Sequence, residues 1–320
     1  MKQKLGIAFN VKELNARPHH LKNYYEIAKR ADEVGLYYLA CPNMVTRGLP
    51  GVETFAYISS LIARTRNVRI GTDVWQLPLY HPIIVASRAA TLDVISKGRF
   101  IFGVGTGWRP DEHETLGVPW RERWERFDET IEIVKKLWTE PSVTYNGKFY
   151  KFKDAVCIKP FQEPHPPVWV GGNSDNSIKR AVKYGDAWAP LAWPFWGFKI
   201  AEGFSFEERV EKFKEYCKQF GRDPKTISFN VRFHTNINSS REKAIEDAMG
   251  HYVGTRKTRV GGGGPAEYQI KWGVWGPAEI VIEKIKEFYK LGADLAILWI
   301  MTTDLRSQWE KVEKEIIPSM

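Results

Sequence analysis

The sequence "EFYKLGADLAILWI" at residues 287–300 decides the fold of this chain. A helical pattern of apolar residues ends at Gly292, and a nearly continuous apolar run begins directly after it. The same order recurs in "KRADEVGLYYLACP" (29–42) and "KRAVKYGDAWAPLA" (179–192). Apolar runs without alternation are typical of strands buried on both faces, as in parallel sheets. The three stretches therefore predict helices that lead into buried parallel strands.

Each repeat places one glycine between helix and strand: Gly35, Gly185 and Gly292. We expect these residues to end their helices in the left-handed conformation, which glycine adopts without a steric clash. The helices themselves are amphipathic. In "WRERWERFDETIEIVKKLW" (120–138) the apolar residues recur at steps of three and four. Pro277 suits the first turn of the helix that follows it.

Strand and helix patterns alternate along the whole chain. The eight expected strands are 4–9, 37–42, 68–74, 100–105, 167–171, 186–192, 227–233 and 294–300. The expected helical segments are 20–34, 53–65, 82–96, 121–138, 175–184, 205–219, 240–251, 277–291 and 304–316. Either 240–251 or 277–291 is additional, because both lie between the last two strands. Strict alternation indicates a parallel α/β protein, and eight strands favour a closed (βα)8 TIM barrel. We expect a single domain over 1–320, with insertions near 139–166 and 252–276, where proline, glycine and charge accumulate.

Composition narrows the class of protein. The chain has 320 residues, of which 43% are apolar and 13% aromatic, enough for a large core. The 47 basic and 38 acidic residues give a net charge of +9, which is either spread over surface helices or helps to hold an acidic ligand. No basic-aromatic strip of a nucleic-acid binder occurs. Cys41, Cys157 and Cys217 are widely spaced, which fits a reducing cytoplasm better than a disulfide framework. The start lacks a signal-peptide pattern, and the longest apolar run, 293–301, is too short to span a bilayer.

A glycine-rich stretch follows the fourth expected strand, in "RFIFGVGTGWRPDEHETLGVPW" (99–120). A dinucleotide fingerprint is disfavoured, because Trp108 stands where its third glycine would be. No phosphate-binding loop of the GxxxxGK type occurs either. The Arg109-Pro110 pair is expected to interrupt the helix, which then starts only near residue 121. The stretch is either a tight loop without a ligand or a strand end whose bare backbone lets a flat ring lie against it.

A second glycine-rich turn lies in "PPVWVGGNSDNSIKRAV" (166–182), between a strand and a helix that starts about Asp175. The backbone N–H groups of Gly172 to Asp175, with the Ser174 hydroxyl, would point at an anion on the positive end of this helix. Alternatively, Ser174 or Asp175 acts only as the cap of the helix. With a barrel around it, the turn favours a phosphate site.

Four segments carry a resemblance to a known family: 69–82, 90–108, 116–138 and 164–190. In order and spacing, "RIGTDVWQLPLYHP", "ATLDVISKGRFIFGVGTGW", "LGVPWRERWERFDETIEIVKKLW" and "PHPPVWVGGNSDNSIKRAVKYGDAWAP" resemble the bacterial luciferase-like superfamily of flavin and deazaflavin oxidoreductases. The resemblance implies a (βα)8 barrel, a small organic substrate and, in many members, a homodimer. It implies coenzyme F420 as the cofactor, with FMN as the alternative, and thus either hydride transfer or an oxygen-dependent monooxygenation.

The resemblance also places the cofactor. The flavin phosphate would sit at Gly171, Gly172, Asn173 and Ser174. The ring would pack over Asp73-Val74 and Gly105-Thr106, at the ends of strands three and four. A non-proline cis peptide bond is expected at Asp73-Val74, with an ordinary trans bulge as the alternative.

One departure concerns acid–base chemistry. Family members often carry an Asp-His pair at the end of strand two, where this chain has Asn43-Met44. Neither side chain is a useful acid or base near neutral pH. Asn43 and His81 are the candidate catalytic residues, and the alternative for His81 is that it only ties a loop. The candidate pocket residues are Met44, Trp75, Trp108 and Trp193; core packing is the alternative for each tryptophan.

Two further motifs have simpler interpretations. "DEHE" (111–114) suggests metal ligands, but consecutive residues rarely close one coordination sphere, so a solvated rim is expected and no metal site is predicted. The basic, glycine-rich stretch 254–268 is either a lid that holds the acidic end of a cofactor or a solvated loop. A flavin-free barrel enzyme for a phosphorylated metabolite, and a binding protein without catalysis, remain as other classes.

Overall fold

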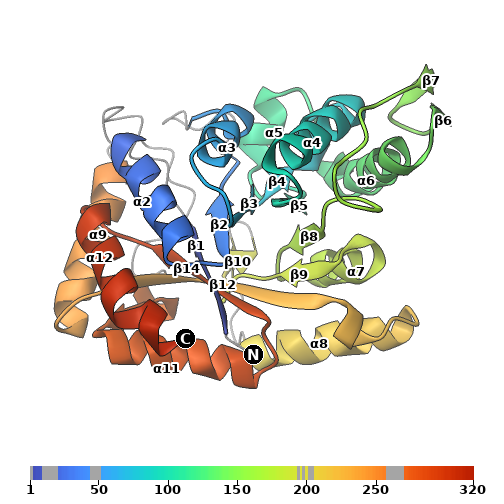
Figure 1. The fold of residues 1–320 in the computed structure, drawn as a ribbon. Coiled ribbons are helices and arrows are strands. Elements are labelled where there is room, and N and C mark those ends of the chain that lie inside the picture. Colours follow the sequence, from blue (N-terminus) through green and yellow to red (C-terminus); the bar gives the residue numbers. More distant parts are fainter. Residues whose placement is uncertain are drawn as a thin grey trace.

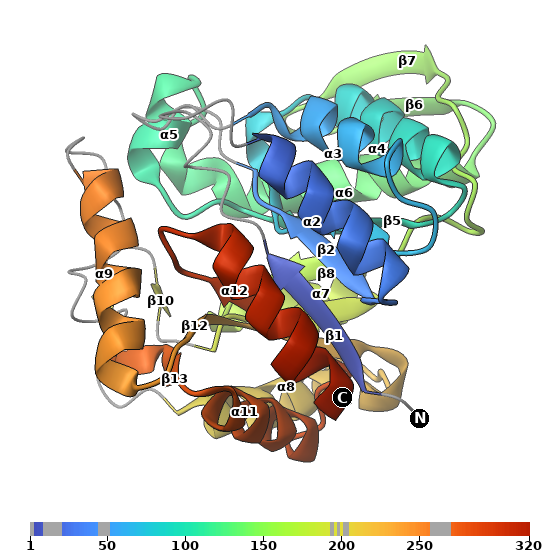
Figure 2. The same ribbon diagram turned by 60° about the vertical axis from the view of Figure 1, so that its left-hand side comes forward.

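Eight parallel strands form a closed barrel with helices around it (Figures 1 and 2). The computed structural model describes residues 3–8, 21–43, 52–192, 195–196, 199–200, 205–256 and 270–320, and of 195–196, 199–200 and 251–256 only the backbone. The barrel strands are β1 (Lys4–Ala8), β2 (Tyr38–Cys41), β3 (Arg69–Thr72), β5 (Phe100–Gly105), β8 (Val168–Gly171), β9 (Ala187–Ala189), β12 (Ser228–Ile237) and β14 (Leu295–Ile300). Each pairs with the next, and β14 pairs with β1, so the predicted (βα)8 barrel is confirmed.

All nine expected helical segments are present. They are α2 (Leu21–Glu33), α3 (Thr54–Ile62), α4 (Pro82–Ser96), α6 (Arg123–Thr139), α7 (Asp175–Tyr184), α8 (Phe206–Gln219), α9 (Arg241–Arg256), α11 (Ala278–Lys290) and α12 (Leu305–Lys311), the last continued by Val312–Ile316. The extra helix between the last two barrel strands is explained by β13 (Val274–Gly276), which pairs in parallel with the end of β12. Among the described residues, a further helix, α5 (Pro110–Thr115), was not predicted.

Helix α5 corrects the expectation that the chain stays non-helical until residue 121. Arg109 is extended, with φ −113° and ψ 113°, as a residue before proline should be. Pro110 then opens a helix, because proline lacks only an N–H that the first turn leaves unpaired. The restriction applied to Arg109 alone and was wrongly extended to the residues after it.

Two of the three helix-ending glycines behave as expected. Gly35 and Gly292 have positive φ values of 77° and 99°. Gly185 is different, because its φ is −89° and the chain runs extended from α7 into β9. A side chain there would lie 2.7 Å from the Ala181 carbonyl oxygen. Gly185 is therefore required for close approach of the backbone, and the predicted left-handed conformation is wrong.

The core has two parts, which follow from the alternation of side chains along each strand. Inside the barrel lie residues such as Tyr38, Ile101, Trp169 and Ile297, in a small cluster. The ring centroids of Tyr38 and Trp169 are 4.7 Å apart. The larger cluster lies between the barrel wall and the helices. The barrel interior is thus filled by a few large side chains, which leaves the ends of the strands as the place for a site.

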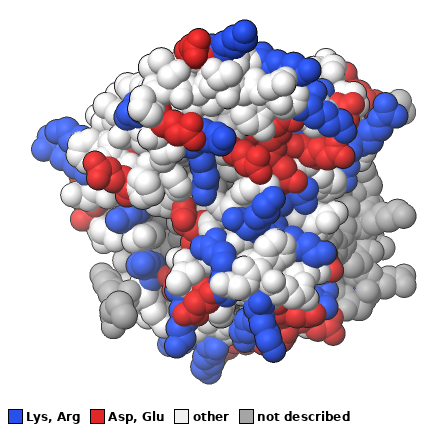
Figure 3. Space-filling model, turned by 90° about the vertical axis from the view of Figure 1, so that its right-hand side faces the viewer, with Lys and Arg blue, Asp and Glu red and all other residues white. Residues whose placement is uncertain are grey.

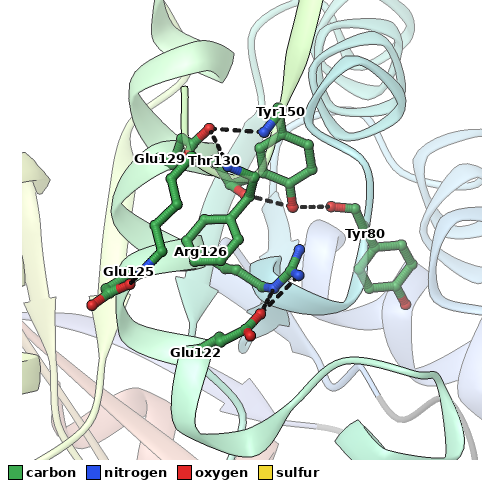
Figure 4. Close-up of polar contacts among 9 residues, drawn as sticks. Tyr80, Glu122, Glu125, Arg126, Glu129, Thr130 and Tyr150 are labelled. Atoms are coloured by element: carbon green, nitrogen blue, oxygen red, sulfur yellow. Dashed lines mark hydrogen bonds and ion pairs between the residues drawn. The ribbon is translucent and has the colours of Figure 1, made fainter. Parts of the chain in front are cut away.

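The predicted insertion near 139–166 contains a hairpin of β6 (Val143–Asn146) and β7 (Lys151–Ala155) outside the barrel. Figure 4 shows how it is fixed to α6. The Glu129 carboxylate accepts hydrogen bonds from the backbone N–H groups of Phe149 and Tyr150, at 3.1 and 2.9 Å. The Tyr150 hydroxyl lies 3.4 Å from the Thr130 hydroxyl oxygen. The Tyr150 hydroxyl also donates to the Tyr80 carbonyl over 3.5 Å, so the hairpin is attached to α6 and to the segment before α4, and it adds no strand to the barrel.

The distribution of surface charge and the state of the cysteines can be compared with what the composition predicts. On the face drawn in Figure 3, acidic and basic side chains are interspersed. No cysteine forms a disulfide, as expected, and all three cysteines are buried. Two remaining short pairs of strands are β4 (Trp75–Gln76) on β5, and β10 (Phe195–Trp196) on β11 (Lys199–Ile200). Within the part of the chain that the structure describes, no helix is long and apolar enough to cross a membrane.

Candidate functional site

The C-terminal ends of the barrel strands together form one end of the barrel, here called the mouth. The chain leaves β3 at this end through a bulge. The Asp73-Val74 peptide bond is cis, as the resemblance implied. β4 then pairs with the end of β5, so that Trp75 lies opposite Val104 and Gln76 opposite Gly105. The bulge is held close to β5, where the Thr72 hydroxyl donates to the Gly103 carbonyl over 2.6 Å.

Val74 occupies the space that two glycines leave open. A side chain at Gly105 would lie 2.7 Å from one Val74 methyl group, and one at Gly171 would lie 2.8 Å from the other. Gly105 and Gly171 come from β5 and β8, and both are predicted cofactor positions. The structure therefore brings together three of the predicted positions into one small apolar surface at the mouth.

Asp73 makes an ion pair that was not predicted from the sequence. Its carboxylate lies 2.6 Å from the Arg232 guanidinium of β12, and the two side chains are only 9% and 12% exposed. Burial raises the pKa of the Asp73 carboxyl, and the charge and hydrogen bond of Arg232 oppose that rise. The only signal in the sequence was an arginine between two apolar residues, Val231 and Phe233, of a predicted strand.

The loop after β5 is tied to the buried face of α5. The His113 side chain is fully buried, and its Nε2 atom lies 2.9 Å from the Thr106 carbonyl oxygen. Its ring packs edge-on against Trp120. Glu112 is also buried, and one of its oxygens accepts from the Gln76 amide over 3.0 Å. The expected solvated rim at "DEHE" is therefore wrong for these two residues, because α5 packs them inward.

His113 should make stability depend on pH. Burial lowers the pKa of His113, so the folded protein keeps this ring neutral at a pH where the unfolded chain is protonated. Below pH about 6.5, the unfolded chain takes up the proton, and this uptake stabilises the unfolded state relative to the folded state. We therefore expect the free energy of unfolding to fall between pH 7 and 5, and to fall less in His113→Gln. Urea unfolding at both pH values checks this, with the half-buried His165→Gln as control; equal losses in wild type and His113→Gln would contradict it.

The second glycine turn leads into α7. Gly172 has a φ of 119°, which L-residues rarely adopt. The Asn173 amide bridges to Leu191, donating to its carbonyl over 2.7 Å and accepting from its N–H over 2.9 Å. The Ser174 hydroxyl oxygen caps α7 by accepting from the Ser177 N–H over 3.2 Å. Ser174 therefore has the capping role that was one of its two interpretations.

The first turn of α7 retains donors for an anion. Among the described residues, no hydrogen bond is formed by the backbone N–H groups of Asp175 and Asn176, which a helix leaves without internal partners. The Asp175 carboxylate itself points to α8, where it lies 2.8 Å from both Arg209 Nη1 and the Tyr216 hydroxyl. Although burial opposes this, those contacts lower the pKa of Asp175.

Two arginines, one on α7 and one on α6, were not predicted. Arg180 donates to the Asn176 carbonyl over 3.1 Å and forms an ion pair with Asp128 at 2.6 Å. Arg123 stacks on the Trp120 ring, 3.8 Å from its centroid. Burial and the nearby Arg180 lower the pKa of Arg123. No carboxylate of a described residue forms an ion pair with Arg123. Its guanidinium donates to the Trp120 carbonyl over 2.9 Å and lies over the Trp124 ring, which Arg180 of α7 also contacts.

Asn43 and His81, the two candidate catalytic residues, both make structural contacts. The Asn43 amide is 7% exposed and donates to the hydroxyls of Thr54 and Tyr80, over 3.1 and 3.0 Å. Its oxygen accepts from the Gln76 N–H over 3.3 Å. His81 caps α4, where Nδ1 accepts from the Ile83 N–H over 3.3 Å. These contacts favour loop-holding roles, and catalysis by either residue stays a prediction.

The candidate pocket residues separate into different surroundings. Trp75 is 2% exposed and packs edge-on against Phe102 and Tyr80 in the outer core, so core packing holds for it. Trp108 is partly exposed at the mouth, with Arg109 over its ring. Met44 and Trp193 lie outside the described residues, as does most of the predicted 254–268 loop. Over the described part of the chain, no three potential ligands gather into a metal site.

Known proteins resemble this chain over most of its length. A family model described as luciferase-like monooxygenase matches residues 6–295. The oxygenase component of the flavin-dependent trigonelline monooxygenase from Acinetobacter baylyi is 28% identical over 300 residues, covering 83% of this chain and 80% of that protein. The F420-dependent glucose-6-phosphate dehydrogenase of Amycolatopsis mediterranei is 27% identical, covering 71% and 68%. The solved structure of an F420-dependent secondary alcohol dehydrogenase matches with a TM-score of 0.79 at 22% identity, covering 100% and 99%, which shows a common fold.

Proposed function

Since the chain belongs to the family of luciferase-like monooxygenases and is thus a flavin- or deazaflavin-dependent oxidoreductase, we propose that its cofactor is coenzyme F420 and its reaction a hydride transfer with a small organic substrate. The observation that carries the proposal is that the mouth has both an anion site and the small apolar surface around Val74. We call this apolar surface the ring seat. Val74 lies over Gly105 and Gly171, and Gly171 leads directly into the turn before α7. A flat ring and a phosphate separated by a short chain would fit this order of residues.

The residues present fit such a group. Val74, Gly105 and Thr106 would contact the ring, and the turn Gly171–Ser174 with the first N–H groups of α7 would hold the phosphate. Arg123 of α6 shares the Trp124 ring with Arg180 of α7 and would supply a further cation on this side of the mouth. When bound, the deazaflavin supplies the carbon that accepts or donates the hydride. The chain supplies placement of the ring and a surface from which water is excluded.

The protein contributes no histidine at the end of β2, where relatives often have one. Asn43 holds β4, α3 and the segment after β4 together through its hydrogen bonds. We propose that this residue keeps the site in shape, and that the proton required by the substrate does not come from the end of β2. Variants of Asn43 should therefore lower stability as well as turnover.

The second candidate is a reduced-FMN-dependent monooxygenase that uses oxygen. It is favoured by the similarity over most of the chain to a flavin-dependent oxygenase component. The same anion turn and ring seat would serve FMN. The expected homodimer also stays a prediction, which analytical ultracentrifugation can check.

Titration of the purified protein distinguishes these cofactors. We expect F420 to bind with a micromolar Kd, about tenfold or more tighter than FMN. If the α7 turn holds the phosphate, the phosphate-free chromophore of F420 should bind about 100-fold more weakly than F420, because charge-assisted hydrogen bonds are lost. Absorbance and fluorescence report binding in each oxidation state. Tight binding of FMN alone, with oxygen consumed when reduced FMN is supplied, selects the second candidate; binding of neither cofactor rejects both.

A further inference from the structure

Asp73 and Arg232 meet across the whole width of the barrel. β3 and β12 are four strands apart in either direction around the eight-stranded ring. The Arg232 Nη1 atom lies 2.6 Å from the Asp73 carboxylate and also donates to the Asp73 backbone carbonyl over 3.0 Å. One nitrogen therefore binds both the side chain and the main chain of the residue that precedes Val74.

Arg232 is itself held in place from the side. Its guanidinium lies over the Trp299 ring of β14, 4.4 Å from the centroid. That ring packs edge-on against His234, two residues along β12 from Arg232, with 4.7 Å between centroids. Stacking on an indole reduces the number of positions that a long arginine side chain can take. The Arg232 guanidinium is therefore restricted to one position, from which it contacts Asp73.

The Asp73 carbonyl is joined directly to the Val74 nitrogen. Its position consequently governs where the Val74 side chain lies over Gly105 and Gly171. The two methyl groups fill the space above these glycines within 2.7 and 2.8 Å of where side chains would begin. A small shift of the carbonyl would move both methyl groups against the β5 and β8 backbones or away from them.

We propose that Arg232 is a positioning residue that fixes the seat of the cofactor ring, by holding the Asp73 carboxylate and carbonyl across the barrel. The inference rests on the proposed function, because it takes Val74 to be the surface on which the ring packs. The inference gives a role to β12, a strand that is part of neither the glycine turns nor the phosphate site. Removal of the guanidinium leaves a buried carboxylate uncompensated, so the bulge would turn toward water and carry Val74 with it.

The test compares Arg232→Met with Arg232→Lys. Methionine fills a similar volume without a donor, and we expect the cofactor Kd to rise about 10- to 100-fold, as for loss of a hydrogen bond to a charged group. The visible circular dichroism band of the bound cofactor should also change, because the surface under the ring has moved. Lysine should restore both, to within about fivefold of the wild-type Kd, since a single nitrogen makes both contacts.

Arg99→Met is the matched control. Arg99 directly precedes β5, at the opposite end of the barrel, and is half-buried, with its guanidinium donating to the carbonyls of Ile62, Thr65 and Val68. Its loss should lower the unfolding midpoint without changing the band of the bound cofactor. If Arg232→Met binds the cofactor with the wild-type Kd and band, the inference is wrong while the proposed function stands. The inference is equally wrong if Arg99→Met changes the band as much as Arg232→Met does. If wild-type protein binds neither F420 nor FMN, the proposed function fails and the inference fails with it.

Discussion

Replacing Gly103 by alanine is expected to destabilise the barrel severely. The new methyl group would lie 1.8 Å from the Thr72 carbonyl oxygen, far inside contact distance. Neither strand can easily yield, because the Thr72 hydroxyl is hydrogen-bonded to the Gly103 carbonyl over 2.6 Å and both residues are buried. Overpacking in a closed core forces backbone shifts, and we expect a loss of about 3 kcal/mol or more in the free energy of unfolding.

Urea unfolding and the yield of folded protein measure this loss. Gly117→Ala is the matched control, since Gly117 has a φ of 70° and no atom within 4 Å of a new side chain. It should lose only about 1 kcal/mol, from the left-handed backbone conformation. Similar losses in the two variants would show that β3 and β5 are not in close contact at this point.

Gly172→Ala is expected to have the largest effect on cofactor binding. Its φ of 119° lies outside the conformations that alanine adopts readily, and the new methyl group would lie 2.6 Å from the Ser177 hydroxyl. That hydroxyl lies 2.8 Å from the Ser174 hydroxyl, which caps α7. The substitution therefore disturbs the cap and the N–H groups that would hold the phosphate. We expect the Kd of F420 or FMN to rise about 100-fold, as the charge-assisted hydrogen bonds are lost.

Gly221→Ala separates this effect from general strain. Gly221 also has a positive φ, of 66°, but it follows α8 and has open space around it. Its replacement should leave the Kd within about twofold of wild type, because surface changes away from a site have small effects. An unchanged Kd in Gly172→Ala, measured on folded protein, would place the phosphate elsewhere.

The barrel strands were predictable because their physical demands are visible in the chain. A strand buried on both faces is mostly apolar, so the eight runs could be recognised without knowing their partners. The end of β3 was less predictable from pattern alone. The Asp73-Val74 bulge came from the family resemblance, since no local rule marks a cis bond between two ordinary residues.

The errors have a common cause, which is tertiary packing. "DEHE" is polar in sequence, yet Glu112 and His113 are buried because α5 folds back on the loop after β5. Gly185 was assigned to a left-handed turn, whereas its role is to let the backbone pass the Ala181 carbonyl. Arg232 was not recognised, because alternation along β12 does not reveal which side chain meets a partner on the far wall.

The crossing ion pair also bears on the order of assembly. Asp73 and Arg232 are 159 positions apart in the sequence, so a growing chain makes β3, β5 and β8 well before the guanidinium exists. A fragment that ends after β9 would contain both glycine turns, yet its Asp73 carboxylate would remain hydrated. Only docking of the last barrel strands brings the counter-charge. A fragment with these six strands is therefore expected to contain the residues of the ring seat without holding them in place.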